Sequence, residues 1–240
     1  MALPDVVSRE EWLAARTALL VREKEATRAR DALNADRRRL PMVRVEQKYL
    51  FDGPQGQVGL AELFGGKRQL IVQHVMFHAD WEAACPSCTA GVDEVAPALI
   101  DHLHARETEF ALVARAPYEK LAAYAESRGW FVPWYSSQGS DFNLDYGVTL
   151  DPLAGQVDYN YAPRADWVAP GETSELPGMS CFLREGEEIY HTYSSYQRGV
   201  EYVGNAYTLL DLTALGRQEL WEEPKGRYER ARDAVPNFEE

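Results

Sequence analysis

Two cysteines of the 240-residue chain stand three residues apart, in the sequence Cys85-Pro86-Ser87-Cys88. A pair at this spacing fits within one helical turn, where it can close a disulfide and take part in thiol–disulfide exchange. The pair follows a mostly apolar run, residues 69–77, and precedes a helical pattern. We therefore expect Cys85 at a helix N-terminus, where unpaired N–H groups and the helix dipole favour the thiolate. Cys85 would act as the nucleophile and Cys88 as the resolving thiol.

Other chemistry remains open for the cysteine pair. A zinc site would need further ligands, for which His74 and His78 are the nearest candidates. The chain has no second Cys-x-x-Cys and no His pair at zinc-finger spacing, so a metal site is disfavoured. Two inert, buried cysteines are a further alternative. The expected dithiol needs no cofactor, although a metal or a small organic cofactor stays an alternative.

A thiol peroxidase is the strongest competing hypothesis. Residues 78–86 resemble the peroxiredoxin loop, including its Cys-Pro step at Cys85 and Pro86. That family has Pro and Thr seven and three residues before the cysteine, where this chain has His78 and Glu82. The hydroxyl that aligns peroxide is therefore missing, and dithiol–disulfide exchange remains the first hypothesis.

Aromatic residues and one proline complete the predicted site. The aromatic residues, dense between residues 130 and 196, are expected to serve packing or to line a pocket beside the dithiol. The substrate-binding residues predicted for that pocket are Trp81, Trp134, Tyr135 and His191. Pro177 precedes an apolar strand that a thioredoxin-like sheet would place facing the dithiol, so we count it as catalytic, with an ordinary loop proline as the alternative.

The elements around the dithiol alternate between strands and helices. Strand patterns are expected over residues 42–51, 69–77 and 109–114, followed by a hairpin over 178–193. Helical patterns are expected over residues 92–103, bent at Pro97, and over 117–129 and 200–212. This alternation predicts an α/β sheet.

The first forty residues form a predicted helical arm. Ser8 and Glu11 match a capping box, and Pro41 stops the pattern, so the helix could reach on the order of 45 Å. The arm has a net charge of +2, whereas the rest of the chain carries −15. The arm could dock on its own domain or grip a second subunit, and we predict a homodimer. The predicted domains are the arm (1–41), a core (42–218) and an acidic tail (219–240).

Composition limits the classes of partner. The net charge of −13 disfavours nucleic acid and anionic membranes as partners. The hydrophobic content of 45% is that of a folded globular protein. Neither a membrane span nor a secretory signal is recognised, so the cytoplasm is the expected location. The expected substrate is a protein or small-molecule disulfide.

Several strings resemble the bacterial thioredoxin-like family grouped as domain of unknown function 899, often described as predicted dithiol–disulfide oxidoreductases. The strings include the segments 85–88, 129–143 and 191–199 and the Leu210-Asp211-Leu212-Thr213 run. Ala214 departs from the proline expected there, which concerns a helix end only. The resemblance implies a thioredoxin-like α/β fold, with a central mixed sheet flanked by helices, a long N-terminal arm and a C-terminal extension. It implies no established substrate, and its redox label rests on analogy.

Overall fold

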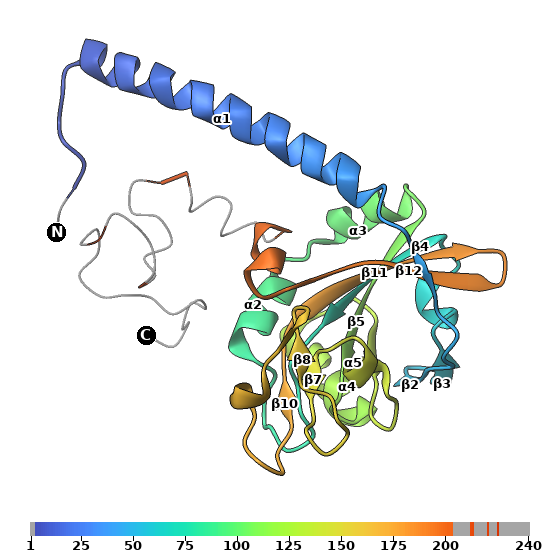
Figure 1. Cartoon of the computed structure of the whole chain (residues 1–240). Helices are drawn as coiled ribbons and strands as arrows, with labels where there is room; N and C mark the ends of the chain where they lie inside the picture. The colour runs from blue at the N-terminus through green and yellow to red at the C-terminus, as the bar shows by residue number, and fades with distance from the viewer. Residues whose placement is uncertain (1–2, 204–211, 214–219, 221–224, 226–240) are drawn as a thin grey trace. The chain divides into compact units, whose positions relative to one another are not determined.

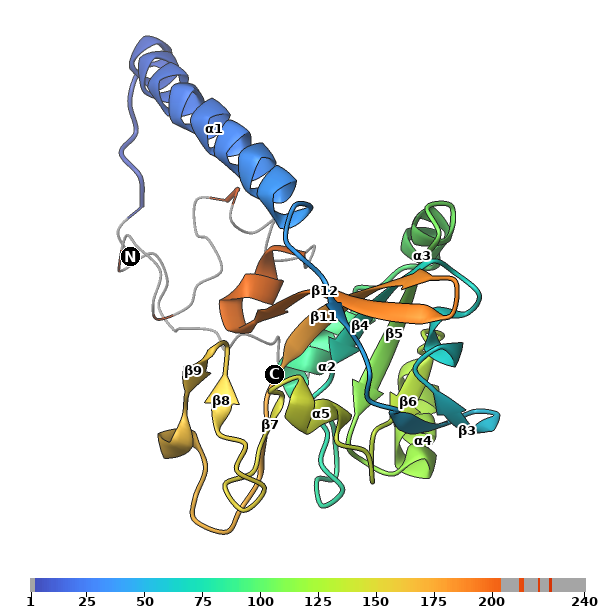
Figure 2. The same ribbon diagram turned by 45° about the vertical axis from the view of Figure 1, so that its right-hand side comes forward.

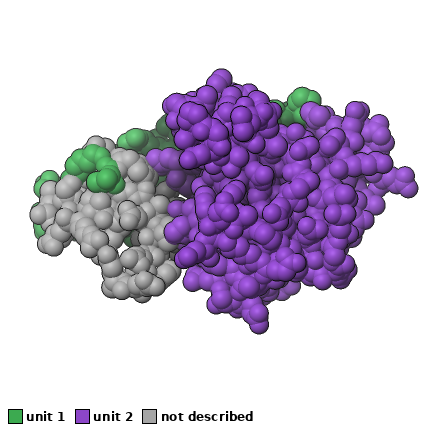
Figure 3. Space-filling view, turned by 90° about the horizontal axis from the view of Figure 1, so that it is seen from below, with its two compact units in different colours: residues 1–41, 210–232 green, residues 42–209, 233–240 purple. Residues whose placement is uncertain are grey.

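The computed structural model describes residues 3–203, 212–213, 220 and 225. It divides into two compact units, residues 1–41 with 210–232 and residues 42–209 with 233–240, coloured green and purple in Figure 3. The chain thus passes from one unit to the other after Pro41, where the sequence changes pattern. The predicted boundary at residue 218 lies outside the described residues, as does most of the predicted tail and of the predicted helix 200–212.

Helix α1 (Arg9–Arg37) is a single long helix, drawn in blue in Figure 1. Its start confirms the predicted capping box. The Ser8 Oγ accepts the backbone N–H of Glu11 at 3.2 Å, and the Glu11 carboxylate accepts the N–H of Ser8 at 2.9 Å. No residue of α1 is buried, and Trp12 is 46% exposed.

An eight-stranded mixed sheet forms the centre of residues 42–209. Its strands are β1 (Val43–Arg44), β2 (Leu50–Gly53), β3 (Gly56–Gly59), β4 (Gln69–His74), β5 (Thr108–Ala114), β6 (Trp134–Ser136), β11 (Gly178–Glu185) and β12 (Glu188–Tyr196). The spatial order is β1-β12-β11-β4-β5-β6-β2-β3. The middle strands β4, β5 and β6 are parallel, and the other neighbouring pairs are antiparallel.

Two small ladders stand beside this sheet (Figure 2). Strand β7 (Thr149–Leu150) pairs with β10 (Ser174–Glu175), and β8 (Asp158–Tyr159) pairs with β9 (Ala162–Pro163). The remaining elements are the α-helices α2 (Pro86–Asp93), α3 (Pro97–His104), α4 (Tyr118–Arg128) and α5 (Phe142–Asp145), and the 3-10 helices η1 (Glu62–Phe64), η2 (Ala165–Trp167) and η3 (Gln197–Val203).

The sheet is buried on both faces, which explains the apolar run of β5. Phe110, Leu112 and Ala114 join the cluster made with α2, α3 and α4. Ala111 and Val113 join the opposite cluster, made with η1, α5 and β2. Because successive strand residues point to opposite faces, a strand between two layers has no polar face. We call these two the helix face and the opposite face of the sheet.

Two predicted elements are wrong in extent. The expected strand 42–51 is interrupted, because β1 and β2 lie near opposite edges of the sheet and residues 45–49 cross between them. The expected bent helix 92–103 is two helices, α2 and α3, separated before Pro97. Proline lacks the N–H for an internal helical bond, and here it starts a new helix instead.

The predicted thioredoxin-like fold is confirmed. The central strand β4, which is parallel to β5, leads through residues 75–84 to the cysteine pair and α2. On the side of β4 away from β5, the β11–β12 hairpin pairs with it through β11 in the antiparallel direction. The expected helix 117–129 is confirmed as α4, with Pro117 before it and Gly129 in the left-handed region after it. Among the described residues, no helix is long and apolar enough to cross a membrane.

Candidate functional site

Backbone hydrogen bonds fix the cysteine pair between the central sheet and α2. Cys85 is the residue that precedes the helix, and Pro86 occupies the first turn, where its missing N–H costs nothing. The N–H of Cys85 donates to the Met76 carbonyl at 2.9 Å, and its own carbonyl accepts the N–H of Thr89 at 2.9 Å. The nucleophile candidate is therefore held at both of its backbone groups.

The two thiols have different surroundings. Cys85 is half-buried, whereas Cys88 is only 6% exposed. A hydrogen bond from the Cys88 thiol is the main reason why the pKa of Cys85 falls to about 6, with smaller contributions from Cys88 and Ser87 N–H groups, and burial opposes the fall. The same bond and burial raise the pKa of Cys88 well above its ordinary value. One thiol thus carries the negative charge and the other keeps its proton.

Met76 links the dithiol to the sheet. Its N–H points to the Cys88 Sγ at 3.5 Å, while its carbonyl accepts from Cys85. The preceding residue, Val75, donates its N–H to the Val113 carbonyl at 2.9 Å and so continues the ladder toward β5. Alternation along a strand turns the Met76 N–H to the other side, where the sulfur replaces a backbone partner.

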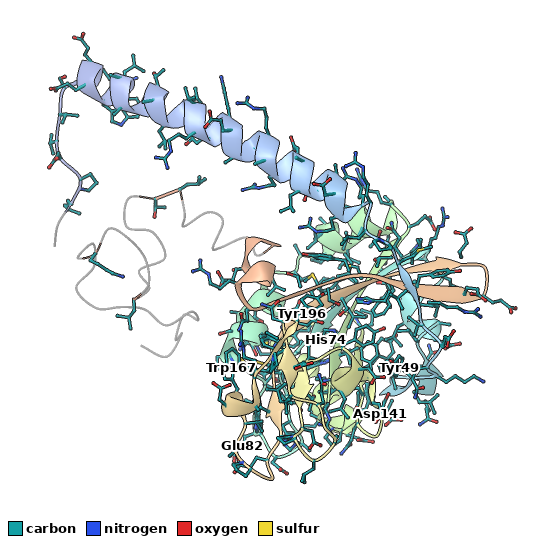
Figure 4. All side chains as sticks on the ribbon, in the orientation of Figure 1. Tyr49, His74, Glu82, Asp141, Trp167 and Tyr196 are labelled. Atoms are coloured by element: carbon teal, nitrogen blue, oxygen red, sulfur yellow. The ribbon has the colours of Figure 1, made fainter. Side chains whose placement is uncertain are left out.

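The loop before Cys85 is pinned from α4. The Lys120 ammonium donates to the Ala79 carbonyl at 2.8 Å and lies 5.3 Å from the centre of the Phe77 ring. Trp81 is half-buried and packs in the cluster that contains both cysteines, and the His78 ring lies 6.5 Å from it. Glu82, labelled in Figure 4, is exposed.

Pro177 directly precedes β11, the strand that pairs with β4. Gly178 pairs with His74, so continuing the antiparallel register by two residues places Leu176 opposite Met76. The Pro177 carbonyl accepts the Tyr159 hydroxyl at 2.7 Å. Tyr159 belongs to the aromatic residues expected to serve packing or to line a pocket, and the sequence did not single it out as a partner of Pro177. Burial is the main cause that raises the pKa of Tyr159, and a negative charge on Cys88 would raise it further.

His74 and His191 lie on the opposite face of the sheet from the dithiol. Four side chains form a hydrogen-bonded series across β4, β11 and β12: His74 Nε2 to Ser180 Oγ at 2.9 Å, Ser180 Oγ to Ser194 Oγ at 2.8 Å, and Ser194 Oγ to His191 Nε2 at 2.7 Å. Burial, with a smaller contribution from His191, lowers the pKa of His74 to about 3. Burial also lowers the pKa of His191. Both rings are therefore neutral at pH 7.

The structure does not bring the predicted aromatic residues into one pocket. Trp134 is 4% exposed and packs on the helix face with Phe77, Tyr124 and Trp130. Its neighbour Tyr135 packs in the cluster on the opposite face. Adjacent strand residues point to opposite faces, so the two cannot line one cavity. Their assignment to substrate binding, like that of Trp81 and His191, stays a prediction.

A hollow lies at the far end of α2, lined by residues 92–93, 95 and 128–132. Asp93 is eight residues beyond Cys85, about 12 Å along a helix, so this hollow is not the pocket expected beside the dithiol. Within the described residues, no group of three His, Cys, Asp or Glu side chains is arranged to hold a metal ion. His74 and His78, the low-ranked ligand candidates, lie in different parts of the structure, one in the sheet and one in the loop.

Comparisons with known proteins bear on the family and not on the chemistry. The family model described as "Bacterial protein of unknown function (DUF899)" matches residues 1–234. A search of curated proteins finds no relative of this chain.

Several solved structures are similar to this chain in fold but have low sequence identity to it. Peroxiredoxin Q from Xanthomonas campestris is 14% identical, with a TM-score of 0.38 over 61% of this chain and 79% of that one. Peroxidoxin BcpB from Mycobacterium tuberculosis is 14% identical, with a TM-score of 0.41 over 64% and 86%. A proposed protein disulfide isomerase from Bacteroides thetaiotaomicron is 17% identical, with a TM-score of 0.40 over 68% and 88%. At this level of similarity, the chemistry has to be argued from the chain's own residues.

Proposed function

The chain belongs to the bacterial family of unknown function DUF899, and we propose that it is a dithiol–disulfide oxidoreductase with Cys85 as nucleophile and Cys88 as resolving thiol. The observation that supports this most is the asymmetry of the pair. Cys85 is half-exposed with a pKa near 6, and Cys88 is buried and keeps its proton. An attacking thiol has to be ionised and accessible, and a resolving thiol has to wait beside it.

The proposed reaction has two displacements. The Cys85 thiolate attacks one sulfur of a substrate disulfide, forms a mixed disulfide, and releases the other sulfur as a thiolate that takes up a proton. Cys88 then loses its proton to solvent and attacks the Cys85 sulfur, which releases the second substrate thiol. Two electrons pass from the protein dithiol to the substrate, and a Cys85–Cys88 disulfide remains. Thiols of a reducing compartment would restore the dithiol, and we propose the cytoplasm as that compartment.

A thiol peroxidase is the second candidate, because the same accessible thiolate could attack a hydroperoxide. Attack on the peroxide oxygen would leave a sulfenic acid on Cys85 and release water or an alcohol, and Cys88 would condense with the sulfenic acid to the same disulfide. The exposed Glu82 offers no hydroxyl where the peroxiredoxin loop carries one. We therefore rank this candidate below disulfide exchange.

The test compares the two oxidants on the fully reduced protein. Bis(2-hydroxyethyl) disulfide and hydrogen peroxide are added separately, and the Cys85–Cys88 disulfide is followed by mass spectrometry and peptide mapping. We expect disulfide exchange to proceed about fivefold faster than with a free thiol of pKa about 8.5 at pH 6.5, because the larger thiolate fraction outweighs the lower intrinsic nucleophilicity of the low-pKa thiolate. Peroxide should react with the Cys85 thiolate no faster than with the thiolate of such a free thiol, when each rate is divided by its thiolate fraction at pH 6.5. A fast peroxide reaction would support the peroxidase instead.

Three variants assign the roles of the cysteines. Cys88→Ser should accumulate a mixed disulfide on Cys85, whereas Cys85→Ser should form none. Cys181→Ser is the matched control, because Cys181 lies on β11 away from the start of α2, and it should behave as the unmodified chain. The proposal fails if no disulfide joins Cys85 and Cys88 under either oxidant.

A further inference from the structure

The backbone that leads into β11 makes hydrogen bonds on two sides, to β7 and to a tyrosine hydroxyl. The segment 174–177, which we call the closed edge, leads into β11 at Gly178, which pairs with His74. Two residues after His74 comes Met76, the residue that holds both cysteines. On a free strand edge, an extended polypeptide can bind by adding a strand, with affinity from main-chain hydrogen bonds. Whether the closed edge still offers such bonds decides how a substrate can approach Cys85.

Strand β7 occupies one side of the closed edge. Ser174 pairs with Leu150 and Glu175 with Thr149, and the Leu176 N–H donates to the Val148 carbonyl at 2.8 Å. Buried side chains reinforce this pairing. The Glu175 carboxylate accepts the Thr149 hydroxyl at 2.9 Å and lies 3.4 Å from the Arg115 guanidinium.

A tyrosine occupies the other side. Pro177 has no N–H, and its carbonyl accepts the Tyr159 hydroxyl at 2.7 Å. The Tyr159 oxygen in turn accepts the N–H of Gln197 at 3.1 Å, so one hydroxyl bridges the ends of β11 and β12. Tyr159 is 1% exposed and packs with Tyr196, Val148 and Leu150. This bridge is thus a packed part of the fold.

From these contacts we infer that the dithiol acts on a low-molecular-weight disulfide and excludes disulfides carried on an extended polypeptide. The inference rests on the proposed function and names its substrate class. A polypeptide has to bring backbone on both sides of its cystine beside Cys85. There the Leu176 N–H is already bonded to the Val148 carbonyl, and the Pro177 carbonyl to the Tyr159 hydroxyl. A small disulfide needs only the half-exposed sulfur.

The test is a length series with one leaving group. Symmetric disulfides of N-acetylcysteine methylamide and of neutral three-, five- and seven-residue peptides with a central cysteine are mixed with the reduced full chain. Release of thiol is followed in a single turnover. The closed edge predicts a rate that falls with length, at least tenfold from one to seven residues. Strand addition would make the rate rise with length, because each residue adds main-chain bonds.

Two tyrosine variants test whether Tyr159 contributes to the closure. We call the factor by which the rate falls from the one-residue to the seven-residue disulfide the length penalty. Tyr159→Phe frees the Pro177 carbonyl and the Gln197 N–H, and should at least halve this penalty. Tyr161→Phe is matched, because it removes a hydroxyl that donates to a different carbonyl, Ser194, at 3.2 Å, and it should leave the penalty unchanged. A rate independent of length or rising with it would overturn the inference while the proposed function stands. Equal length penalties in Tyr159→Phe and Tyr161→Phe would show that the closed edge does not cause the decrease in rate. Failure of every disulfide to react would refute the proposed function itself.

Discussion

Removing the Cys88 thiol should raise the pKa of Cys85, because the Cys88 hydrogen bond is the largest cause of the low value of about 6. At that pKa, about nine-tenths of Cys85 is thiolate at pH 7, against about one-hundredth at the ordinary value of 9.0. A hydrogen bond to a charged group contributes about 1.5–3 kcal/mol, or roughly 1–2 pKa units. Since Cys85 is half-exposed, water replaces part of the lost bond, and we expect a rise of about one unit in Cys88→Ala.

The rate of alkylation by iodoacetamide between pH 4 and 10 measures this pKa, with the site identified by peptide mapping. Cys88→Ser is the matched variant, because its hydroxyl can still donate to the thiolate. It should keep the pKa of Cys85 within about half a unit of the unmodified value. At pH 7, Cys88→Ala should therefore fall to roughly one-half thiolate and Cys88→Ser should not. The reasoning is refuted if Cys88→Ala and Cys88→Ser give the same pKa, or if the unmodified chain titrates above pH 8.

Three further outcomes are expected. The pKa of His74 is about 3 in the folded state and 6.5 in the unfolded state, so on acidification the unfolded state binds the proton first. The contribution of His74 to the free energy of unfolding is therefore fully present above pH 6.5 and is lost as the pH falls toward 3. Between pH 7 and pH 5, the free energy of unfolding measured with urea should therefore fall by about 2 kcal/mol more in the unmodified chain than in His74→Gln. An equal fall in the two proteins would contradict this. Gly178→Ala should lower the free energy of unfolding by about 1–3 kcal/mol, because the added carbon would meet the Tyr196 ring at 2.9 Å; Gly91→Ala, in α2 with its nearest atom at 3.7 Å, should be neutral or stabilising in the same assay. We also propose that α1 mediates a homodimer through an apolar stripe at helical spacing, made of Trp12, Ala15, Leu19, Ala26, Ala29 and Leu33. Trp12→Glu should therefore lower the mass measured by light scattering, whereas Val21→Glu, exposed but off this stripe, should not; a monomeric unmodified chain would rule the dimer out.

Several local features follow from sequence alone. Pro86 before a helical pattern sets the start of α2, and Pro117 with Gly129 brackets α4. The β11–β12 hairpin follows from two apolar runs joined around Gly186, whose φ of 64° suits the turn. These features depend on residues within a few positions of one another, so the local pattern contains the information that decides them.

The order of the strands in the sheet could not be predicted from the local sequence pattern. Residues 42–51 read as one strand because their alternation is correct for both β1 and β2, yet the chain crosses the sheet between them. Period-two alternation also shows that Trp134 and Tyr135 point apart, but it does not show which strands and helices each ring meets. The strand neighbours depend on burial of both sheet faces by segments far apart in the chain.

The sequence by itself determined the dithiol, its place between a buried strand and a helix, and the family that shares these strings. Only the tertiary structure decided what surrounds the dithiol. The backbone of Met76 separates a charged Cys85 from a buried Cys88, and Tyr159 and Val148, distant in sequence, close the backbone beside them. The physical reason is that a thiol pKa and a strand edge are set by neighbours, and the fold selects those neighbours through long-range packing that no spacing of cysteines records.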